Sequence, residues 1–275
     1  MSNATPTVVL VHGAFADASS WNGVIERLQA KGIPVIAPAN PLRGIAHDST
    51  YTAAVFEQIE GPVLAVGHSY GGAVITNAAT DAKNVAGLVY VAAFAPEEGE
   101  TLGAAEAKSK DSVLNSALVP RQYPTADGGS ATEFYIDPAK ARDAFAGDLS
   151  DQQAALIAAA QRPIAEAAFS EPNGPPAWKH LPSWTVLATD DKAAGTDVVR
   201  SMAERAGARI TEVEGSHVIM VSQPDVVAGV IMDAVAAVGS PNAASATGRW
   251  VAAISAACWS ERSPANASRA FAGSM

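Results

Sequence analysis

The six residues Gly67-His68-Ser69-Tyr70-Gly71-Gly72 constrain this chain more than any other stretch. They follow an apolar run, residues 62–66, that is short enough to be a buried parallel strand. Residues 72–79, which come next, are small and apolar, as in a helix packed against a sheet. A serine in a sharp turn between a strand and a helix is the arrangement of a nucleophile elbow. We therefore interpret Ser69 as a catalytic nucleophile, and the alternative is an ordinary turn or N-cap serine.

Strand and helix patterns alternate on both sides of this turn. Runs rich in apolar and β-branched residues predict six strands, at residues 7–11, 34–37, 62–66, 86–93, 184–189 and 209–213. Helices are expected between them, and the one at residues 48–60 should bury Tyr51, Val55, Phe56 and Ile59. This alternation predicts an α/β fold with a mostly parallel six-stranded sheet and helices on both faces.

The alternation stops between residues 95 and 181. We find no strong strand pattern there, and proline and glycine recur among short helical stretches. About 85 residues are too many for a loop in a compact domain, so we predict a mainly helical cap over the site. Residues 1–94 and 182–238 then form the core. Residues 239–275, rich in Ala, Ser, Asn and Pro, are expected to be a flexible tail, unless Trp250 and Trp259 cover an apolar patch on the core.

A serine nucleophile needs a histidine base that is oriented by a carboxylate. In folds with a nucleophile elbow the acid and then the histidine follow the serine along the chain. Asp190 and Asp191 come directly after the strand predicted at 184–189, and position alone does not choose between them. His217 is the one histidine after these acids, so its place in the chain selects it as the base. His12 and His68 are expected to have structural roles.

The oxyanion of a tetrahedral intermediate needs two hydrogen-bond donors. We expect one to be the backbone N–H of Tyr70, directly after the nucleophile. The second should come from the loop after the first strand, where we favour the N–H of Ala14 over that of Phe15. Phe15 and Phe94 are candidates for the substrate-binding wall.

Composition excludes several classes of function. A net charge of -10 argues against nucleic acid and anionic membranes as partners. The single cysteine, Cys258, excludes an internal disulfide and a cysteine metal cluster, and the histidines lack the spacing of metal ligands. No apolar run approaches the ~20 residues of a membrane span, and no basic, apolar leader opens the sequence, so we expect a cytoplasmic protein.

Four motifs together resemble the α/β-hydrolase superfamily. They are H-G-A-F at residues 12–15, G-H-S-Y-G-G, T-D-D at residues 189–191 and G-S-H at residues 215–217. The single cap in mid-chain is similar to the methylesterase and hydroxynitrile lyase branch, and G-S-H-V-x-M at residues 215–220 is similar to bacterial esterases of that type. The resemblance covers about residues 6–238.

This resemblance implies a protein without a cofactor or metal that hydrolyses small carboxylic esters. It implies Asp191 as the acid, because related esterases place it second after the threonine that ends the strand. The lyases carry a threonine and a lysine where this chain has Gly13 and Val218, which favours ester hydrolysis. Two alternatives stay open: a lyase or other non-hydrolytic enzyme with the same three residues, and a small-molecule-binding protein on this scaffold.

Overall fold

The structure, a computed structural model, describes residues 5–239. Its centre is a six-stranded sheet in the order β2-β1-β3-β4-β8-β9, in which every neighbouring pair is parallel. The strands are β1 (Thr7–Val11), β2 (Val35–Ile36), β3 (Val63–His68), β4 (Val85–Val91), β8 (Ser183–Ala188) and β9 (Arg209–Val213). The parallel sheet predicted from the sequence is confirmed, although β2 is only 2 residues long.

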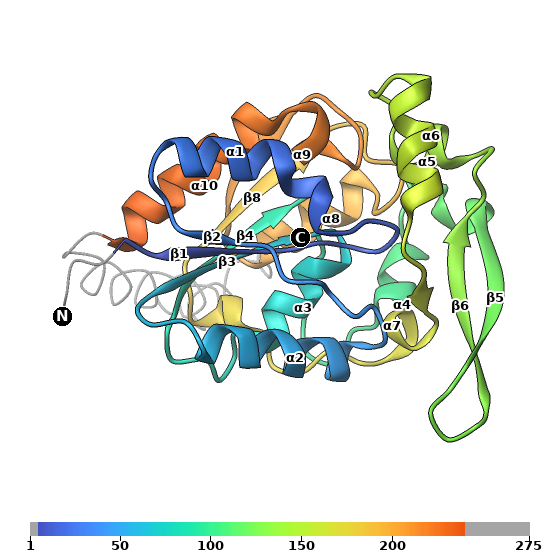
Figure 1. The fold of residues 1–275 in the computed structure, drawn as a ribbon, viewed down its shortest axis with the longest axis horizontal. Coiled ribbons are helices and arrows are strands. Elements are labelled where there is room, and N and C mark those ends of the chain that lie inside the picture. The colour runs from blue at the N-terminus through green and yellow to red at the C-terminus, as the bar shows by residue number, and fades with distance from the viewer. Residues whose placement is uncertain (1–4, 240–275) are drawn as a thin grey trace, which may run out of the picture. The chain divides into compact units, whose positions relative to one another are not determined.

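Helices cover both faces of this sheet. Helices α1 (Asn22–Ala30) and α10 (Pro224–Gly239) pack against each other on one face, and α2 (Ile45–Glu57) and α3 (Tyr70–Ala78) do so on the other (Figure 1). A short 3-10 helix, η1 (Ala18–Trp21), precedes α1. Helix α8 (Thr196–Arg205) packs against β8 and β9, and the short α9 (Ile219–Ser222) precedes α10. The apolar side chains of the strands and of these helices form one buried core.

Helix α2 buries part of the stripe that the sequence predicted: Phe56 is fully buried, and Val55 and Ile59 are half-buried against the core. Tyr51, expected inside, is 44% exposed, whereas Asp48 and Thr52 are buried. Asp48 accepts hydrogen bonds from the hydroxyl of Tyr70 at 2.8 Å and from the backbone N–H of Arg43 at 3.0 Å. Because a polar side chain with buried partners shares the inner face with Phe56, the apolar spacing alone was wrong about Tyr51.

The turn between β3 and α3 brings strand and helix very close together. Ser69, at its apex, has φ 53° and ψ -123°, a backbone conformation that residues other than glycine rarely adopt. A Cβ atom on Gly67 would lie 2.5 Å from the carbonyl carbon of Gly71, and one on Gly71 would collide with the carbonyl oxygen of Val11. The two glycines are therefore required by the approach of helix to strand, as the elbow interpretation predicts.

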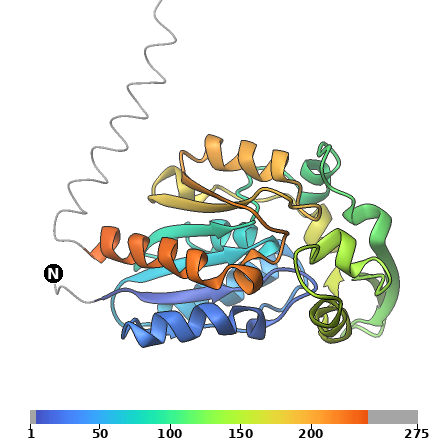
Figure 2. The ribbon, with the colours of Figure 1, turned by 90° about the horizontal axis from the view of Figure 1, so that it is seen from above.

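The cap lies beyond the carboxyl ends of the core strands, at one end of the sheet (Figures 1 and 2). It contains helices α4 (Leu102–Glu106), η2 (Leu114–Ala117), α5 (Ala141–Phe145), α6 (Asp151–Ala160) and α7 (Ala167–Ser170), and strands β5 (Leu118–Pro124), β6 (Ser130–Ile136) and β7 (Ile164–Ala165). The 3-10 helix η3 (Ala177–Lys179), also predicted as part of the cap, packs instead against α3 and directly precedes β8.

The prediction that the cap has no strong strand was wrong. Strands β5, β6 and β7 form a three-stranded antiparallel sheet. Strand β5 is an edge strand that carries Pro120 and Pro124, and most of its side chains are exposed or half-buried. Proline is tolerated on an edge strand, and a strand with little burial lacks the apolar alternation from which strands are recognised.

No helix among residues 5–239 is long and apolar enough to cross a bilayer. Residues 240–275 lie outside the described part of the chain. The expectations about the tail, including those about Trp250 and Trp259, fall on those residues.

Candidate active site

Ser69 is held at the elbow by backbone hydrogen bonds on both sides. Its N–H donates to the carbonyl of Val91 at 3.3 Å, and its own carbonyl accepts from the N–H groups of Gly72 and Phe94 at 3.0 and 3.2 Å. The residue is 7% exposed, and it lines a pocket between the core and the cap. These bonds fix the strained backbone and direct the side chain of Ser69 to the pocket.

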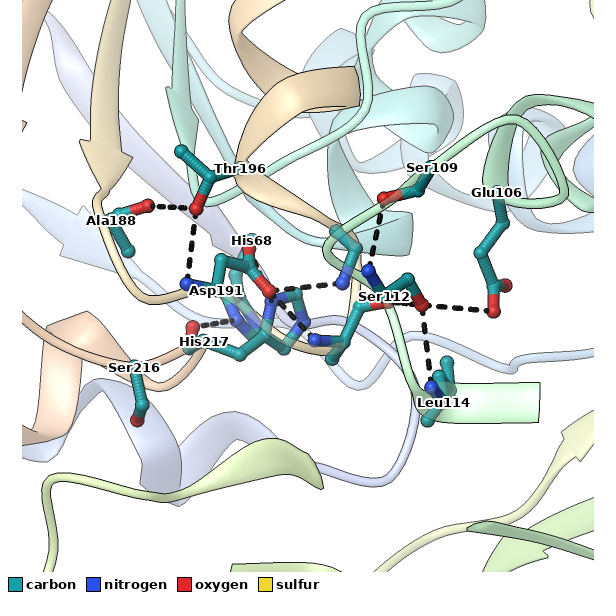
Figure 3. A network of polar contacts seen from close by, with 12 residues as sticks. His68, Glu106, Ser109, Ser112, Leu114, Ala188, Asp191, Thr196, Ser216 and His217 are labelled. Atoms are coloured by element: carbon teal, nitrogen blue, oxygen red, sulfur yellow. Dashed lines mark hydrogen bonds and ion pairs between the residues drawn. The ribbon is translucent and has the colours of Figure 1, made fainter. Parts of the chain in front are cut away.

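Asp191 and His217, the acid and base expected from the sequence, form a buried hydrogen-bonded pair. Nδ1 of His217 lies 2.9 Å from each carboxylate oxygen of Asp191, and both residues are 1% exposed (Figure 3). Oδ1 of Asp191 also accepts the backbone N–H groups of Ala193 and Ala194, each at 2.9 Å. The carboxylate is thereby fixed from two sides, so that the imidazole carries its proton on Nδ1 and presents Nε2 as the acceptor.

The neighbouring aspartate points elsewhere. The side chain of Asp190 is 62% exposed and lies 3.8 Å from the ammonium group of Lys192, in a surface ion pair. Its backbone N–H donates to the carbonyl of Gly215 at 3.1 Å, which ties together the two loops that carry Asp191 and His217. Of the two aspartates that the sequence left open, only Asp191 contacts the histidine.

Ser69 and His217 line the same pocket. Within the described part of the chain, the hydroxyl of Ser69 has no hydrogen-bond partner. In sites without substrate, such bonds are often long and shorten only when the reacting group binds. Serine, histidine and aspartate are thus gathered at one site, in the order along the chain that the elbow predicts.

Two backbone N–H groups next to Ser69 have no backbone acceptor among residues 5–239. Tyr70 is the first residue of α3, so its N–H has no acceptor within the helix. The N–H of Ala14 has no acceptor among the described residues, and both Ala14 and Tyr70 line the pocket. The N–H of Phe15 instead donates to the carbonyl of Arg162 at 3.1 Å. This bond leaves Ala14 as the available donor of that loop.

His12 and His68 are buried and brace the site. Nδ1 of His12 donates to the carbonyl of Gly13 at 2.9 Å, and its Nε2 accepts the backbone N–H of Asn40 at 2.9 Å. Nε2 of His68 donates to the carbonyl of His217 at 3.0 Å. Burial lowers the pKa of His12, and burial together with the nearby His217 lowers that of His68 well below its usual value. Both imidazoles are therefore neutral supports.

The pocket is apolar except for a few groups. Its walls come from both the core and the cap. The lining residues are Ala14, Phe15, Ser69, Tyr70, Phe94, Leu102, Glu106, Leu114, Phe145, Phe169, Ala193, Ala194 and His217. Phe15 and Phe94 stand in the wall where the sequence placed them. Among residues 5–239, no cluster of His, Cys, Asp or Glu side chains is arranged to hold a metal ion.

Among the polar side chains that line the pocket, Glu106 is the one that the sequence did not indicate. It lies at the end of α4, it is 4% exposed, and burial raises the pKa of its carboxyl to about 7. Nothing in the sequence around it marks it, because a single glutamate in a short helix of the cap is typical of a solvated surface. Only the fold of the cap turns this glutamate toward the pocket.

The cap also contacts the loops of the acid and the histidine directly. The hydroxyl of Ser112 donates to the carbonyl of Ala193 at 2.7 Å, two residues after Asp191. The hydroxyl of Ser216, next to His217, donates to the carboxylate of Asp148. Both loops are therefore supported from the cap as well as from the sheet.

Comparisons with known proteins place this arrangement in a family. A 25% identical relative, the alpha/beta hydrolase nvfD of Aspergillus novofumigatus, aligns over 83% of this chain and 96% of its own length. A carbendazim hydrolyzing esterase of Nocardioides sp. (strain SG-4G) is 37% identical over 34% of this chain and 44% of its own. The structure of the methylesterase MES16 from Arabidopsis superposes with a TM-score of 0.69 at 18% identity, covering 84% of this chain and 99% of that one.

The similarity to the methylesterase shows a common fold, as the motifs near Ser69 and His217 led us to expect. The model of the alpha/beta hydrolase family matches residues 8–230, which include Ser69, Asp191 and His217. The chain belongs to the alpha/beta hydrolase family.

Proposed function

We propose that this protein is a cofactor-free serine esterase that hydrolyses small carboxylic esters through an acyl-enzyme. The observation that carries the proposal is the buried Asp191–His217 pair in the pocket that Ser69 also lines. A serine hydroxyl reacts at neutral pH only when a base of this kind accepts its proton. The esterase and methylesterase activities named for the relatives support the same reaction.

Each group has one role in the proposed mechanism. The Ser69 oxygen attacks the ester carbonyl, and Nε2 of His217 takes the hydroxyl proton. The carboxylate of Asp191 stabilises the imidazolium that forms, and the N–H groups of Ala14 and Tyr70 bind the oxyanion. His217 then gives its proton to the departing alcohol. A water molecule, deprotonated by His217, releases the acid and restores Ser69.

The pocket suggests the size of the substrate. Aromatic and aliphatic side chains make up most of its wall, and side chains of the cap close it on one side. We infer a small, mostly apolar ester as the substrate, and neither a nucleic acid nor a membrane as a partner.

The test is a panel of methyl and p-nitrophenyl esters of graded acyl length, assayed with the wild-type protein and with Ser69→Ala. Wild type should turn over the short esters, and Ser69→Ala should lose activity by a factor on the order of 10⁶, as in other triads that lack the nucleophile. Circular dichroism and the unfolding midpoint should show that the variant is folded. A folded Ser69→Ala protein that keeps a tenth of the wild-type rate would exclude Ser69 as the nucleophile.

A further inference from the structure

One polar group of the pocket has no part in the proposed reaction. Of the pocket residues with polar side chains, Ser69 and His217 belong to the catalytic set, and the hydroxyl of Tyr70 already donates to Asp48. The remaining one is Glu106. Its side chain is more than nine-tenths buried, and it lines the same pocket as the catalytic serine.

The hydrogen bonds around Ser112 decide which form of Glu106 the free site holds. The hydroxyl of Ser112 lies 2.7 Å from the carbonyl oxygen of Ala193 and 3.4 Å from Oε1 of Glu106 (Figure 3). A hydroxyl has one proton, and the shorter bond takes it. Glu106 can then bond to Ser112 only by donating its own proton to the serine oxygen. This count of protons favours the neutral carboxylic acid in the free site.

This assignment agrees with the electrostatics of the site. A carboxylate surrounded by apolar walls loses its hydration, and this burial outweighs the opposing effects of Ser112 and His217 and raises the pKa of Glu106 to about 7. With the acid proton directed at Ser112, the second oxygen, Oε2, is left as an acceptor. No described residue donates a hydrogen bond to Oε2.

We propose that Glu106 selects esters that carry a hydrogen-bond donor, an N–H or O–H group, on an otherwise apolar body. The substrate's donor would satisfy the acceptor that the protein leaves open. A buried acceptor without a partner costs binding energy, so an ester of the same shape with a methyl group in place of the donor binds less well. The inference rests on the proposed esterase function.

The experiment uses two matched pairs of esters. The neutral pair is methyl 3-hydroxybutanoate and methyl 3-methylbutanoate, which differ by a hydroxyl in place of a methyl group. The cationic pair is 2-(dimethylamino)ethyl butanoate, protonated at neutral pH, and 3-methylbutyl butanoate. The measured quantity is the ratio of kcat/KM within each pair, for wild type, Glu106→Gln and Glu106→Leu.

We expect wild type to favour the donor ester in at least one pair. In Glu106→Leu that ratio should fall by about tenfold to a hundredfold, mostly through KM, as for a lost hydrogen bond to a buried polar group. The apolar ester of each pair is the reference, because the ratio within a pair cancels any change that the leucine makes to catalysis of both esters. Glu106→Gln retains a neutral carbonyl acceptor, so it should keep the preference for the hydroxyl and lose any preference for the cation.

Two results would overturn the inference: a wild-type protein that favours neither donor, and a folded Glu106→Leu protein whose ratios equal those of wild type. Binding of the same esters to Ser69→Ala, and to Ser69→Ala combined with Glu106→Leu, separates this inference from the proposed function. A protein that hydrolyses none of these esters, yet binds the donors more tightly only when Glu106 is present, would refute the esterase and leave the selectivity established. Equal binding by both proteins would refute the selectivity alone.

Discussion

Replacing Glu106 by glutamine should stabilise the folded protein increasingly as the pH rises. The folded protein holds the proton on Glu106 up to about pH 7, whereas an unfolded chain releases it near 4.5. Between these values the unfolded state binds fewer protons than the folded state, so the free energy of unfolding falls as the pH rises. Glutamine does not ionise, so the free energy of unfolding of the variant does not fall with pH for this reason.

The size of the effect follows from the burial of the carboxyl. At about 1.4 kcal/mol for each pH unit, a shift from 4.5 to about 7 corresponds to about 3 kcal/mol. Glu106 is only 4% exposed, so solvent screens little of this energy. The stability difference between Glu106→Gln and wild type should therefore grow by about 2–3 kcal/mol from pH 5 to pH 8.

Urea denaturation at pH 5, 6, 7 and 8 measures this difference, since the other titrating groups are common to both proteins. Glu98→Gln, at an exposed position of the same segment, controls for the loss of one negative charge. Two stability curves that run parallel over this range would refute the reasoning, because they would mean that Glu106 ionises in the folded protein as it does in water.

Three further outcomes are expected. Asp191→Asn should lose roughly 10⁴-fold in kcat, because the amide favours the wrong tautomer of the histidine, while Asp190→Asn should lose less than about tenfold; steady-state kinetics of both variants distinguishes the two acids. Tyr70→Phe should lower the free energy of unfolding by about 1–3 kcal/mol, measured in urea, because buried Asp48 loses one hydrogen bond and keeps that of the Arg43 amide. Esters with four-carbon acyl chains should be hydrolysed faster than those with sixteen, because the pocket is small and partly closed by the cap; faster turnover of the longer chain would indicate an open groove.

The core could be predicted because short-range patterns mark its strands and the elbow: the strand before Ser69 and the glycines after it follow from local geometry. The acid and the histidine were predicted from the chain order that the fold with this elbow implies, and the structure brings these residues together. The choice of Asp191 over Asp190 came from the resemblance, and the contact between Asp191 and His217 agrees with it. The roles of these residues in catalysis stay predictions until the variants are measured.

The cap could not be predicted in the same way. Strand β5 buries none of its 7 residues and β6 buries only 2 of its 7, so these strands carry little apolar pattern. The burial of Glu106 and of Asp48 is set by contacts with residues far along the chain, which the periodicity of the sequence does not reveal. Buried polar groups were missed in both cases, since the rules for reading a sequence assign such residues to the surface.

The contacts between the cap and the two catalytic loops restrict how this protein can be recombined with its relatives. The cap supplies much of the pocket wall, so a chimera with a foreign cap would acquire a new pocket. The same exchange would remove Ser112 and Asp148, which hold the loops of the acid and the histidine. Exchanging the cap would therefore change substrate specificity and catalytic rate at the same time. A foreign cap that keeps Ser112 and Asp148 should transfer its specificity while the catalytic rate is preserved.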